Sequence, residues 1–252
     1  MRRILIIGIG AGNPEHITIQ AVNALRQVDV FFVTDKGAGK EDLMHLRTQL
    51  CERYIPEPRY RTIEVKDPQR DRSASDYESA VEAWHEQRAA IYAALIREQL
   101  GENECGGFLV WGDPALYDST IRIIGDIAAR GEVALDYEVI PGISSIQVLA
   151  ARHRIPLNQI GAPVQITTGR RLAENPGLHS GDAVVLLDGE CAFNDVTDRQ
   201  TEIYWGAYLG TAQEILLSGT LREVAARIES VRSEARERNG WIMDTYLLRK
   251  PS

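Results

Sequence analysis

Residues 4–14 read ILIIGIGAGNP, an apolar run that ends in three alternating glycines and an Asn-Pro pair. The apolar run predicts a buried strand, and the glycines predict a turn in which the main chain can approach another group closely. Asn13 is a suitable cap and Pro14 a suitable first residue for a following helix. We therefore predict a strand at 3–8, a glycine loop, and a helix at 14–26.

The spacing of these glycines departs from that of a dinucleotide-binding loop. Such a loop has the pattern G-x-G-x-x-G, whereas Gly12 comes one position early. Pro14 has no N–H, which removes a donor to a pyrophosphate. Asp35, at the end of the second predicted strand, could still serve as a ribose-binding acid. The sequence disfavours a dinucleotide site but does not exclude one. A turn with a purely structural role is a further alternative.

The first half of the chain alternates between short apolar runs and helical patterns. This alternation predicts an α/β fold with a mainly parallel sheet that is covered on both faces. The predicted strands are 3–8, 28–33, 60–66, 107–111 and 137–140. The predicted helices are 14–26, 40–53, 75–100 and 116–130, with Ser75 or Asp76 as the cap of the third.

After a helix at 143–153, the pattern changes to strands with short connections, which is typical of a mixed sheet. These strands are predicted at 163–168, 183–188, 201–206, 213–219 and 241–248. We therefore expect two α/β domains, an N-terminal domain at 1–145 with a mainly parallel sheet and a C-terminal domain at 146–252 with a mixed sheet. We expect the active site in the cleft between them.

Composition limits the classes of function. The chain has 252 residues, of which 44% are hydrophobic and 25% charged, and a net charge of −8. No apolar run is long enough for a membrane span, and the N-terminus lacks a signal-peptide pattern, so we expect a cytoplasmic protein with no membrane partner. The acidic balance disfavours nucleic acid as a partner. The cysteines and histidines lack metal-ligand spacing, so we expect no metal and three structural thiols.

Two further loops follow predicted parallel strands. One is WGDPALYDS at 111–119, and the other is VIPGISSI at 139–146. The carboxyl ends of parallel strands meet at one edge of a sheet, where open α/β folds bind ligands. Ser144 and Ser145 begin the next predicted helix and can offer hydroxyl and N–H donors there. We therefore expect the three loops to converge at this edge.

The motifs G-x-G-x-G-(D/N)-P, G-D-P-x-x-Y and P-G-I-S-S, in this order, resemble the tetrapyrrole (corrin/porphyrin) methyltransferase family. The resemblance implies a homodimer that binds S-adenosylmethionine and methylates a small-molecule tetrapyrrole. The charged insertion at 66–100 resembles most the member that methylates C-1 of precorrin-5 with loss of acetate. The family's cofactor positions correspond here to Pro14, Trp111, Gly112, Asp113, Leu116, Tyr117, Ser144, Ser145, Asp188, Ala207, Tyr208 and Thr245.

The implied chemistry has two parts. Methyl transfer needs mainly positioning, whereas loss of acetate needs a proton acceptor and attack by water. Asp113, Tyr117 and Asp118 are the candidate catalytic residues by position, although each could instead shape its loop. Asn13, Trp111 and Asp118 depart from the residues usual in the family, which puts the transfer of catalytic roles in doubt.

A polycarboxylate substrate requires local cations on an acidic protein. Arginine suits this task because its guanidinium can bind a carboxylate through two hydrogen bonds. Arg170 and Arg171 are the first choice, because they follow the strand that opens the second domain. The other basic clusters are Arg59, Arg61, Lys66, Arg70 and Arg72, and Arg152 with Arg154. Any of these residues could also be an ordinary solvated surface charge.

Other functions stay open at this point. The same fold could methylate another precorrin position, a ribosomal RNA or a modified histidine on a protein, although the acidic balance disfavours RNA. The protein could also be a nicotinamide-dependent reductase, in which the glycine loop would bind a dinucleotide, although the spacing of the glycines disfavours this function. A non-catalytic ligand-binding protein could retain the cofactor pocket alone.

Overall fold

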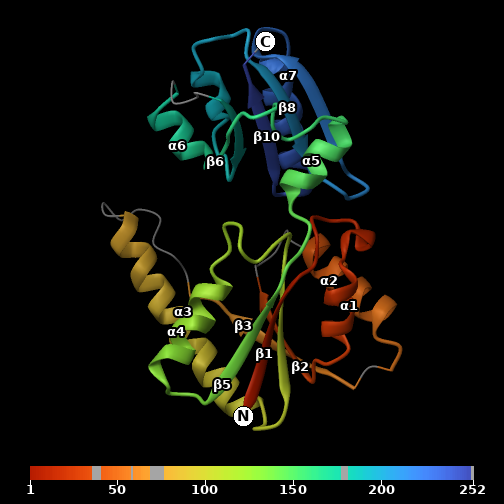
Figure 1. Cartoon of the computed structure of the whole chain (residues 1–252), viewed down its shortest axis with the longest axis vertical. Coiled ribbons are helices and arrows are strands. Elements are labelled where there is room, and N and C mark those ends of the chain that lie inside the picture. Colours follow the sequence, from red (N-terminus) through yellow and green to blue (C-terminus); the bar gives the residue numbers. More distant parts are fainter. Residues whose placement is uncertain (36–40, 58, 69–76, 177–180, 251–252) are drawn as a thin grey trace. The chain divides into compact units, whose positions relative to one another are not determined.

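The computed structural model describes residues 1–35, 41–57, 59–68, 77–176 and 181–250. The chain forms two compact units, each with its own sheet (Figure 1). The first unit contains Met1–Gly10 and Pro14–Ile143, and the second contains Ala11–Asn13 and Ser144–Ser252. Asp35 ends a strand, but its side chain lies outside the described part of the chain, as do Arg70, Arg72, Ser75 and Asp76.

The first unit is built on a five-stranded parallel sheet in the order β3-β2-β4-β1-β5. Its strands are β1 (Arg2–Gly8), β2 (Val30–Asp35), β3 (Arg61–Lys66), β4 (Cys105–Val110) and β5 (Leu135–Ile140). The sheet confirms the predicted fold class for this half of the chain. Because β1 lies between β4 and β5, the loops that follow these three strands are neighbours.

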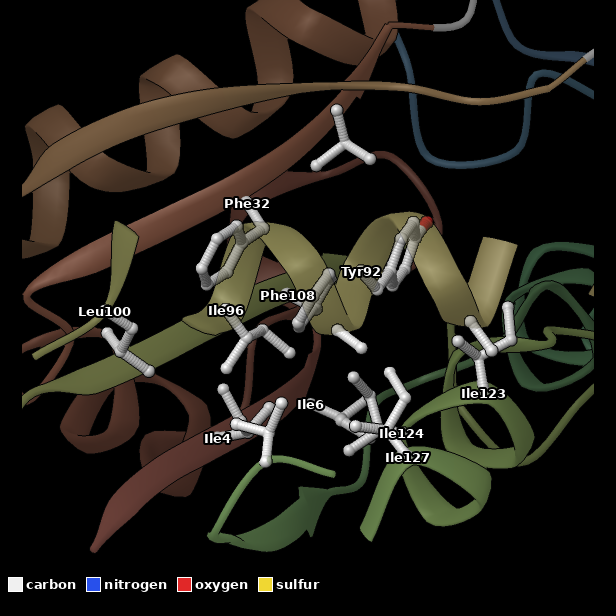
Figure 2. Close-up of a cluster of buried hydrophobic side chains, with 14 of the residues drawn as sticks. Ile4, Ile6, Phe32, Tyr92, Ile96, Leu100, Phe108, Ile123, Ile124 and Ile127 are labelled. Carbon is white, nitrogen blue, oxygen red and sulfur yellow. The ribbon is translucent and has the colours of Figure 1, made fainter. Parts of the chain in front are cut away.

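Helices cover both faces of this sheet, as the apolar strands predict (Figure 1). They are α1 (Ile19–Leu25), α2 (Glu41–Tyr54), α3 (Tyr77–Gln99) and α4 (Thr120–Arg130). Helices α1 and α2 pack on one face, and α3 and α4 on the other. Figure 2 shows the second of these cores, where Phe108 stacks against both Phe32 and Tyr92, with ring centroids 5.2 and 5.3 Å apart.

The predicted start of the first helix is wrong. Pro14–His16 forms only a single 3-10 turn, η1, and α1 begins at Ile19. Thr18 is its N-cap, because the Thr18 hydroxyl accepts a hydrogen bond from Ala21 N at 3.0 Å. The expected cap, Asn13, clusters instead with the second unit.

The second unit has a mixed five-stranded sheet in the order β6-β7-β10-β8-β9, as predicted. Strands β6 and β7 are parallel, and the remaining neighbours are antiparallel. The strands are β6 (Val164–Thr168), β7 (Asp182–Leu186), β8 (Glu202–Ala207), β9 (Ile215–Thr220) and β10 (Asp244–Arg249).

The helical elements of the second unit were only partly predicted. They are α5 (Ser145–His153), α6 (Gly169–Glu174), η2 (Ala192–Asp195) and α7 (Leu221–Asn239). Only α5 was expected from the sequence. The long helix α7 packs with α6 and η2 over one core, around the buried Trp205 and Tyr246.

The three cysteines are free and buried, in agreement with their expected structural role. Burial raises the pKa of the Cys51, Cys105 and Cys191 thiols to about 11, which keeps them protonated and unreactive near neutral pH. Among the described residues, no cluster of histidine, cysteine and acidic side chains has the arrangement of a metal site. None of the described helices combines the length and apolar character that a membrane crossing requires.

One surface ion pair makes the first unit sensitive to acid. Glu104 accepts hydrogen bonds from both Nη atoms of Arg61, at 2.9 and 2.7 Å, and from Gly101 N at 2.7 Å. These donors lower the pKa of Glu104 to about 2. The carboxylate therefore stabilises the folded state above its ordinary pKa, and this contribution is lost as the pH falls towards about 2.

We expect Glu104→Gln to be less stable than the wild type near neutral pH, by no more than ~1 kcal/mol because solvent screens the pair. The difference shrinks as the pH falls below about 4, where the wild-type pair begins to be lost. Urea unfolding at several pH values measures this effect. Glu102→Gln, an exposed neighbour, is the matched control. A Glu104→Gln deficit that stays constant with pH would contradict the assignment.

Candidate functional site

The loops after β1, β4 and β5 meet at the carboxyl edge of the parallel sheet. A Cβ atom on Gly8 would lie 2.6 Å from Gly142 N and 2.9 Å from the carbonyl oxygen of Gly112. A Cβ atom on Gly142 would overlap that same Gly112 oxygen. The main chains are thus in direct contact, with no room for a side chain. The predicted convergence of the three loops is confirmed at these glycines.

A short main-chain bridge joins the first two loops. Gly112 N donates to the Gly10 carbonyl oxygen at 2.8 Å, and Gly10 N donates to the Gly112 carbonyl oxygen at 3.3 Å. Both residues have positive φ angles, 82° at Gly10 and 68° at Gly112, which glycine adopts without a steric penalty. The bridge therefore depends on glycine at both positions.

Asp113 joins the second and third loops. Its Oδ2 atom accepts a hydrogen bond from Gly142 N at 2.9 Å, and its Oδ1 atom accepts one from Ala115 N at 2.8 Å. Both carboxylate oxygens are therefore engaged by main-chain N–H groups. This arrangement gives Asp113 a loop-shaping contact, and its predicted role toward cofactor or substrate stays a prediction.

Tyr117 and Asp118 lie on the outer part of the same loop. Tyr117 is 48% exposed and has a φ of 52°, a conformation that non-glycine residues seldom adopt. Partial burial raises the pKa of the Tyr117 phenol, so it stays protonated near neutral pH and can donate a hydrogen bond. Asp118 Oδ1 accepts from Thr120 N at 2.7 Å, at the start of α4. Leu116 is half-buried, and its N–H donates to the Asp113 carbonyl oxygen.

Trp111 is the first residue of the second loop, and Pro14 is the last residue of the first loop. The Trp111 ring packs against the core between the sheet and helices α1 and α2, and its buried Nε1 atom has no hydrogen-bond partner among the described residues. Pro14 opens the η1 turn, and its carbonyl oxygen accepts from the Tyr54 hydroxyl at 3.5 Å. An unpartnered indole N–H is a donor that a ligand can use.

The predicted residues of the second unit form two groups. In the first group, Ser144 is the N-cap of α5 and forms a capping box with Gln147. Ser145 Oγ accepts a hydrogen bond from the Thr245 hydroxyl at 3.0 Å, so these two predicted site residues are in contact. The S-x-x-Q pattern predicts such a capping box, although the sequence analysis did not use Gln147.

In the second group, Asp188 is only 6% exposed and is held on all sides. Its Oδ2 atom accepts from the Tyr246 hydroxyl at 2.7 Å and from Ala192 N at 2.8 Å. Its Oδ1 atom accepts from Glu190 N at 3.0 Å. Burial and the neighbouring carboxylate raise the pKa of Tyr246 well above its ordinary value, which keeps this donor protonated.

Ala207 and Tyr208 lie at the end of β8. Ala207 is fully buried, and Tyr208 has a φ of 50°. The Tyr208 hydroxyl donates to the Trp241 carbonyl oxygen at 2.5 Å, so its polar end is engaged inside the second unit. Leu187 was not singled out from the sequence, yet it is 67% exposed and has a φ of 53° directly after β7. Its unusual backbone conformation could not be foreseen from a leucine in an apolar run.

The predicted basic residues differ in their availability. Arg170 and Arg171 are exposed in the first turn of α6, and Arg171 pairs with Glu174 at 3.3 Å. Arg61 binds Glu104, and Arg152 pairs with Glu214, so each has an acidic partner within its own unit. Partly buried Arg47, which sequence analysis missed, donates to the Leu109 carbonyl oxygen at 3.2 Å.

We expect Gly142→Ala to destabilise the first unit by about 1–3 kcal/mol, because the new methyl group overlaps main chain that cannot rotate away. Gly125→Ala is the matched control. A Cβ atom at Gly125, within α4, meets only the Tyr137 hydroxyl at 3.4 Å, and alanine favours a helix. Chemical unfolding compares the two variants. Equal stability of Gly142→Ala and the wild type would contradict the close approach of the loops.

We expect Asp113→Asn to lower the free energy of unfolding by about 1–3 kcal/mol, because an amide cannot accept both main-chain hydrogen bonds. Asp126→Asn on α4 removes an equal charge from an exposed position and serves as the control. Thermal and urea unfolding report the difference. If both variants match the wild type, the two hydrogen bonds of Asp113 do not hold the loops together.

Comparison with known proteins shows the family of the chain. The family model for tetrapyrrole (corrin/porphyrin) methylases matches residues 3–225. A precorrin-6A synthase (deacetylating) from Sinorhizobium sp is 56% identical over 250 residues, which cover 99% of this chain and 96% of that protein. Both matches include all three glycine loops, and the match to the Sinorhizobium protein covers nearly the whole chain.

Two solved structures extend the comparison. A cobalamin synthesis related protein (CobF) from Corynebacterium diphtheriae is 40% identical over the full length of both chains, with a TM-score of 0.86. A uroporphyrin-III C-methyltransferase from Thermus thermophilus, solved with S-adenosylhomocysteine, covers 98% of this chain and 97% of its own. With a TM-score of 0.64 and 18% identity, it shows the shared fold. The chain belongs to the tetrapyrrole (corrin/porphyrin) methylase family.

Proposed function

We propose that the protein is an S-adenosylmethionine-dependent methyltransferase that acts on precorrin-5. It methylates C-1 and releases acetate, which gives precorrin-6A in aerobic cobalamin biosynthesis. The observation that carries this proposal is the 56% identity to a precorrin-6A synthase across nearly the whole of both chains. The contacts among the glycine loops support it independently, because they lie at the carboxyl edge of the parallel sheet, where open α/β folds bind ligands.

The residues at this edge fit a cofactor with a small, charged methionine end. The glycines present main chain with no side chain above it, and Trp111 Nε1 is a buried donor without a partner among the described residues. S-adenosylmethionine supplies an electrophilic methyl group. In this proposal its methionine end contacts Trp111, Gly112, Asp113, Leu116, Tyr117 and Pro14.

The residues of the second unit contact the rest of the cofactor in this proposal. Ser144 and Ser145 offer the N-terminus of α5, and Thr245 holds Ser145 by a hydrogen bond. The adenine side is assigned to Asp188, Ala207 and Tyr208. The Asp188 carboxylate and the Tyr208 hydroxyl are engaged within the unit, so in this proposal the group shapes the adenine side by packing.

The catalytic work of the chain is positioning and proton transfer. Methyl transfer requires in-line alignment of the methyl group with C-1, which a rigid loop edge supports. Among the candidates for the proton acceptor, we favour Asp118, because both oxygens of Asp113 already accept main-chain hydrogen bonds. Tyr117 is protonated near neutral pH and is assigned a donor role.

The remaining assignments concern the substrate and the assembly. Arg170 and Arg171 bind substrate carboxylates in this proposal, since both are exposed at the start of α6. The protein acts as a homodimer in this proposal, as the resemblance of its motifs to the family implies. Its location in the cytoplasm is proposed from the sequence, which shows no signal-peptide pattern and no apolar run of membrane-spanning length. A second candidate function is methylation of another precorrin position. It is favoured by the 26% identity over 181 residues to a precorrin-2 C(20)-methyltransferase from Sinorhizobium sp.

Incubation with precorrin-5 and S-adenosylmethionine tests the function. We expect mass spectrometry of the products to show one added methyl group, loss of the acetyl group and released acetate. The matched control omits the cofactor, and a parallel titration replaces it with a nicotinamide dinucleotide. A methyl gain without acetate would indicate another corrin position. Cofactor binding without methyl transfer would indicate a non-catalytic protein, and nicotinamide binding alone would indicate a reductase.

A further inference from the structure

A buried arginine ties three elements of the first unit together next to the candidate site. Arg88 lies on α3 and is only 7% exposed. Its Nε atom donates to Asp67 Oδ1 at 2.9 Å, directly after β3, and its Nη1 atom donates to Ser119 Oγ at 2.6 Å, directly before α4. Its Nη2 atom donates to the Tyr92 hydroxyl. Each guanidinium nitrogen therefore has an acceptor.

The surroundings of Arg88 fix its position further. Its guanidinium carbon lies 4.6 Å from the centroid of the Trp84 ring and 5.1 Å from that of Tyr92. Trp84 Nε1 in turn donates to the Pro68 carbonyl oxygen at 2.8 Å. A planar cation held between two aromatic rings and a carboxylate has little freedom to move.

The Ser119 hydroxyl binds Arg88 and does not cap helix α4. Ser119 occupies the N-cap position of α4 but makes no side-chain hydrogen bond to the helix. Its hydroxyl accepts from Arg88, and Asp118 Oδ1 supplies the hydrogen bond to Thr120 N. Because Asp118 supplies the hydrogen bond to the first N–H of α4, the Ser119 hydroxyl is available as an acceptor for Arg88.

The loop that bears Tyr117 is therefore anchored at both ends. Asp113 attaches its beginning to Gly142, and Arg88 attaches its end through Ser119. Tyr117 lies between these anchors, exposed and with a positive φ angle. Such a conformation persists only where the surrounding structure enforces it, and it is often found at functional sites.

We propose that Arg88 is a positioning residue that holds Tyr117 and Asp118 toward the tetrapyrrole by anchoring Ser119 to Asp67. This inference rests on the proposed function for its chemistry, but the anchor itself can be measured without turnover. Arg88 holds the end of the loop at Ser119, next to Asp118, the proposed proton acceptor. The cofactor contacts proposed at Trp111, Gly112 and Asp113 lie at the other end of the loop, which Asp113 attaches to Gly142. Loss of Arg88 should therefore affect tetrapyrrole turnover more than cofactor binding.

Hydrogen exchange measures the anchor directly. In Arg88→Met, we expect exchange in peptides that cover residues 111–124 to be about tenfold faster, as the loss of a charge-assisted hydrogen bond implies, with β1 unchanged. Ser119→Ala removes only the acceptor and should produce part of this effect. The double variant should match Arg88→Met, because both changes break the same tie.

Arg249→Met is the matched control. Arg249 is a partly buried arginine that also forms an ion pair, with Asp182 at 2.7 Å, but it lies in the second unit. The Arg249→Met variant should leave hydrogen exchange in peptides that cover residues 111–124 unchanged. Faster exchange throughout the first unit in Arg88→Met, or strictly additive effects of Arg88→Met and Ser119→Ala, would overturn the anchor.

Kinetics test the consequence of the anchor for function. We expect Arg88→Met to lower kcat with precorrin-5 by about tenfold while the Kd for S-adenosylmethionine changes by less than about threefold. Arg88→Lys should restore part of kcat, because a lysine can reach one of the acceptors. A parallel loss of cofactor affinity would overturn the positioning role. If the wild type does not turn over precorrin-5, the proposed function fails, while the exchange result still decides whether the anchor exists.

Discussion

The site depends on the absence of side chains where β1, β4 and β5 end. Gly8, Gly112 and Gly142 bring three main chains into direct contact, and a Cβ atom at Gly8 or Gly142 would collide with the main chain of a neighbouring loop. The strand order β4-β1-β5 places the three loops side by side, and the glycines allow them to close on one another. The contact brings together the loops that carry the candidate residues after β1, β4 and β5.

Once the glycines are in contact, polar groups hold the loops in place. Asp113 uses both carboxylate oxygens on main-chain N–H groups, and the Gly10–Gly112 bridge adds two further hydrogen bonds. The rest of the 111–119 loop connects this contact to α4, and within it Tyr117 has a positive φ angle. A rigid inner part and a strained outer part suit a protein that must fix a cofactor and align a large substrate.

The sequence predicted much of this architecture because its signals are local. The apolar runs marked all ten strands of the described structure, and the glycine and proline motifs marked the three loops. Helix α7 was missed although Thr220 and Glu223 form a capping box, a pattern that is visible in the sequence. The start of α1 was misplaced because Asn13-Pro14 resembles a helix start, whereas Thr18 provides the side-chain cap.

What the sequence could not predict depends on contacts between distant residues. The role of Arg88 requires Asp67 and Ser119 to meet on one guanidinium, and helical periodicity shows only that Arg88 lies on α3. Likewise, the sequence does not show that the Asp188 carboxylate binds the Tyr246 hydroxyl, or that the Tyr208 hydroxyl binds the Trp241 carbonyl oxygen. These hydrogen bonds are internal to the second unit. Family motifs identify the positions of candidate residues, but only the structure shows which polar atoms at those positions already have hydrogen-bond partners.

A crystal structure of the protein with S-adenosylhomocysteine would show whether the cofactor binds where the three glycine loops meet. We expect electron density for the homocysteine end against the main chain of Gly112 and Gly142, with the contact between Gly8 and Gly142 preserved. Density for the ligand at another part of the molecule, or a complex in which these three loops have separated, would contradict it.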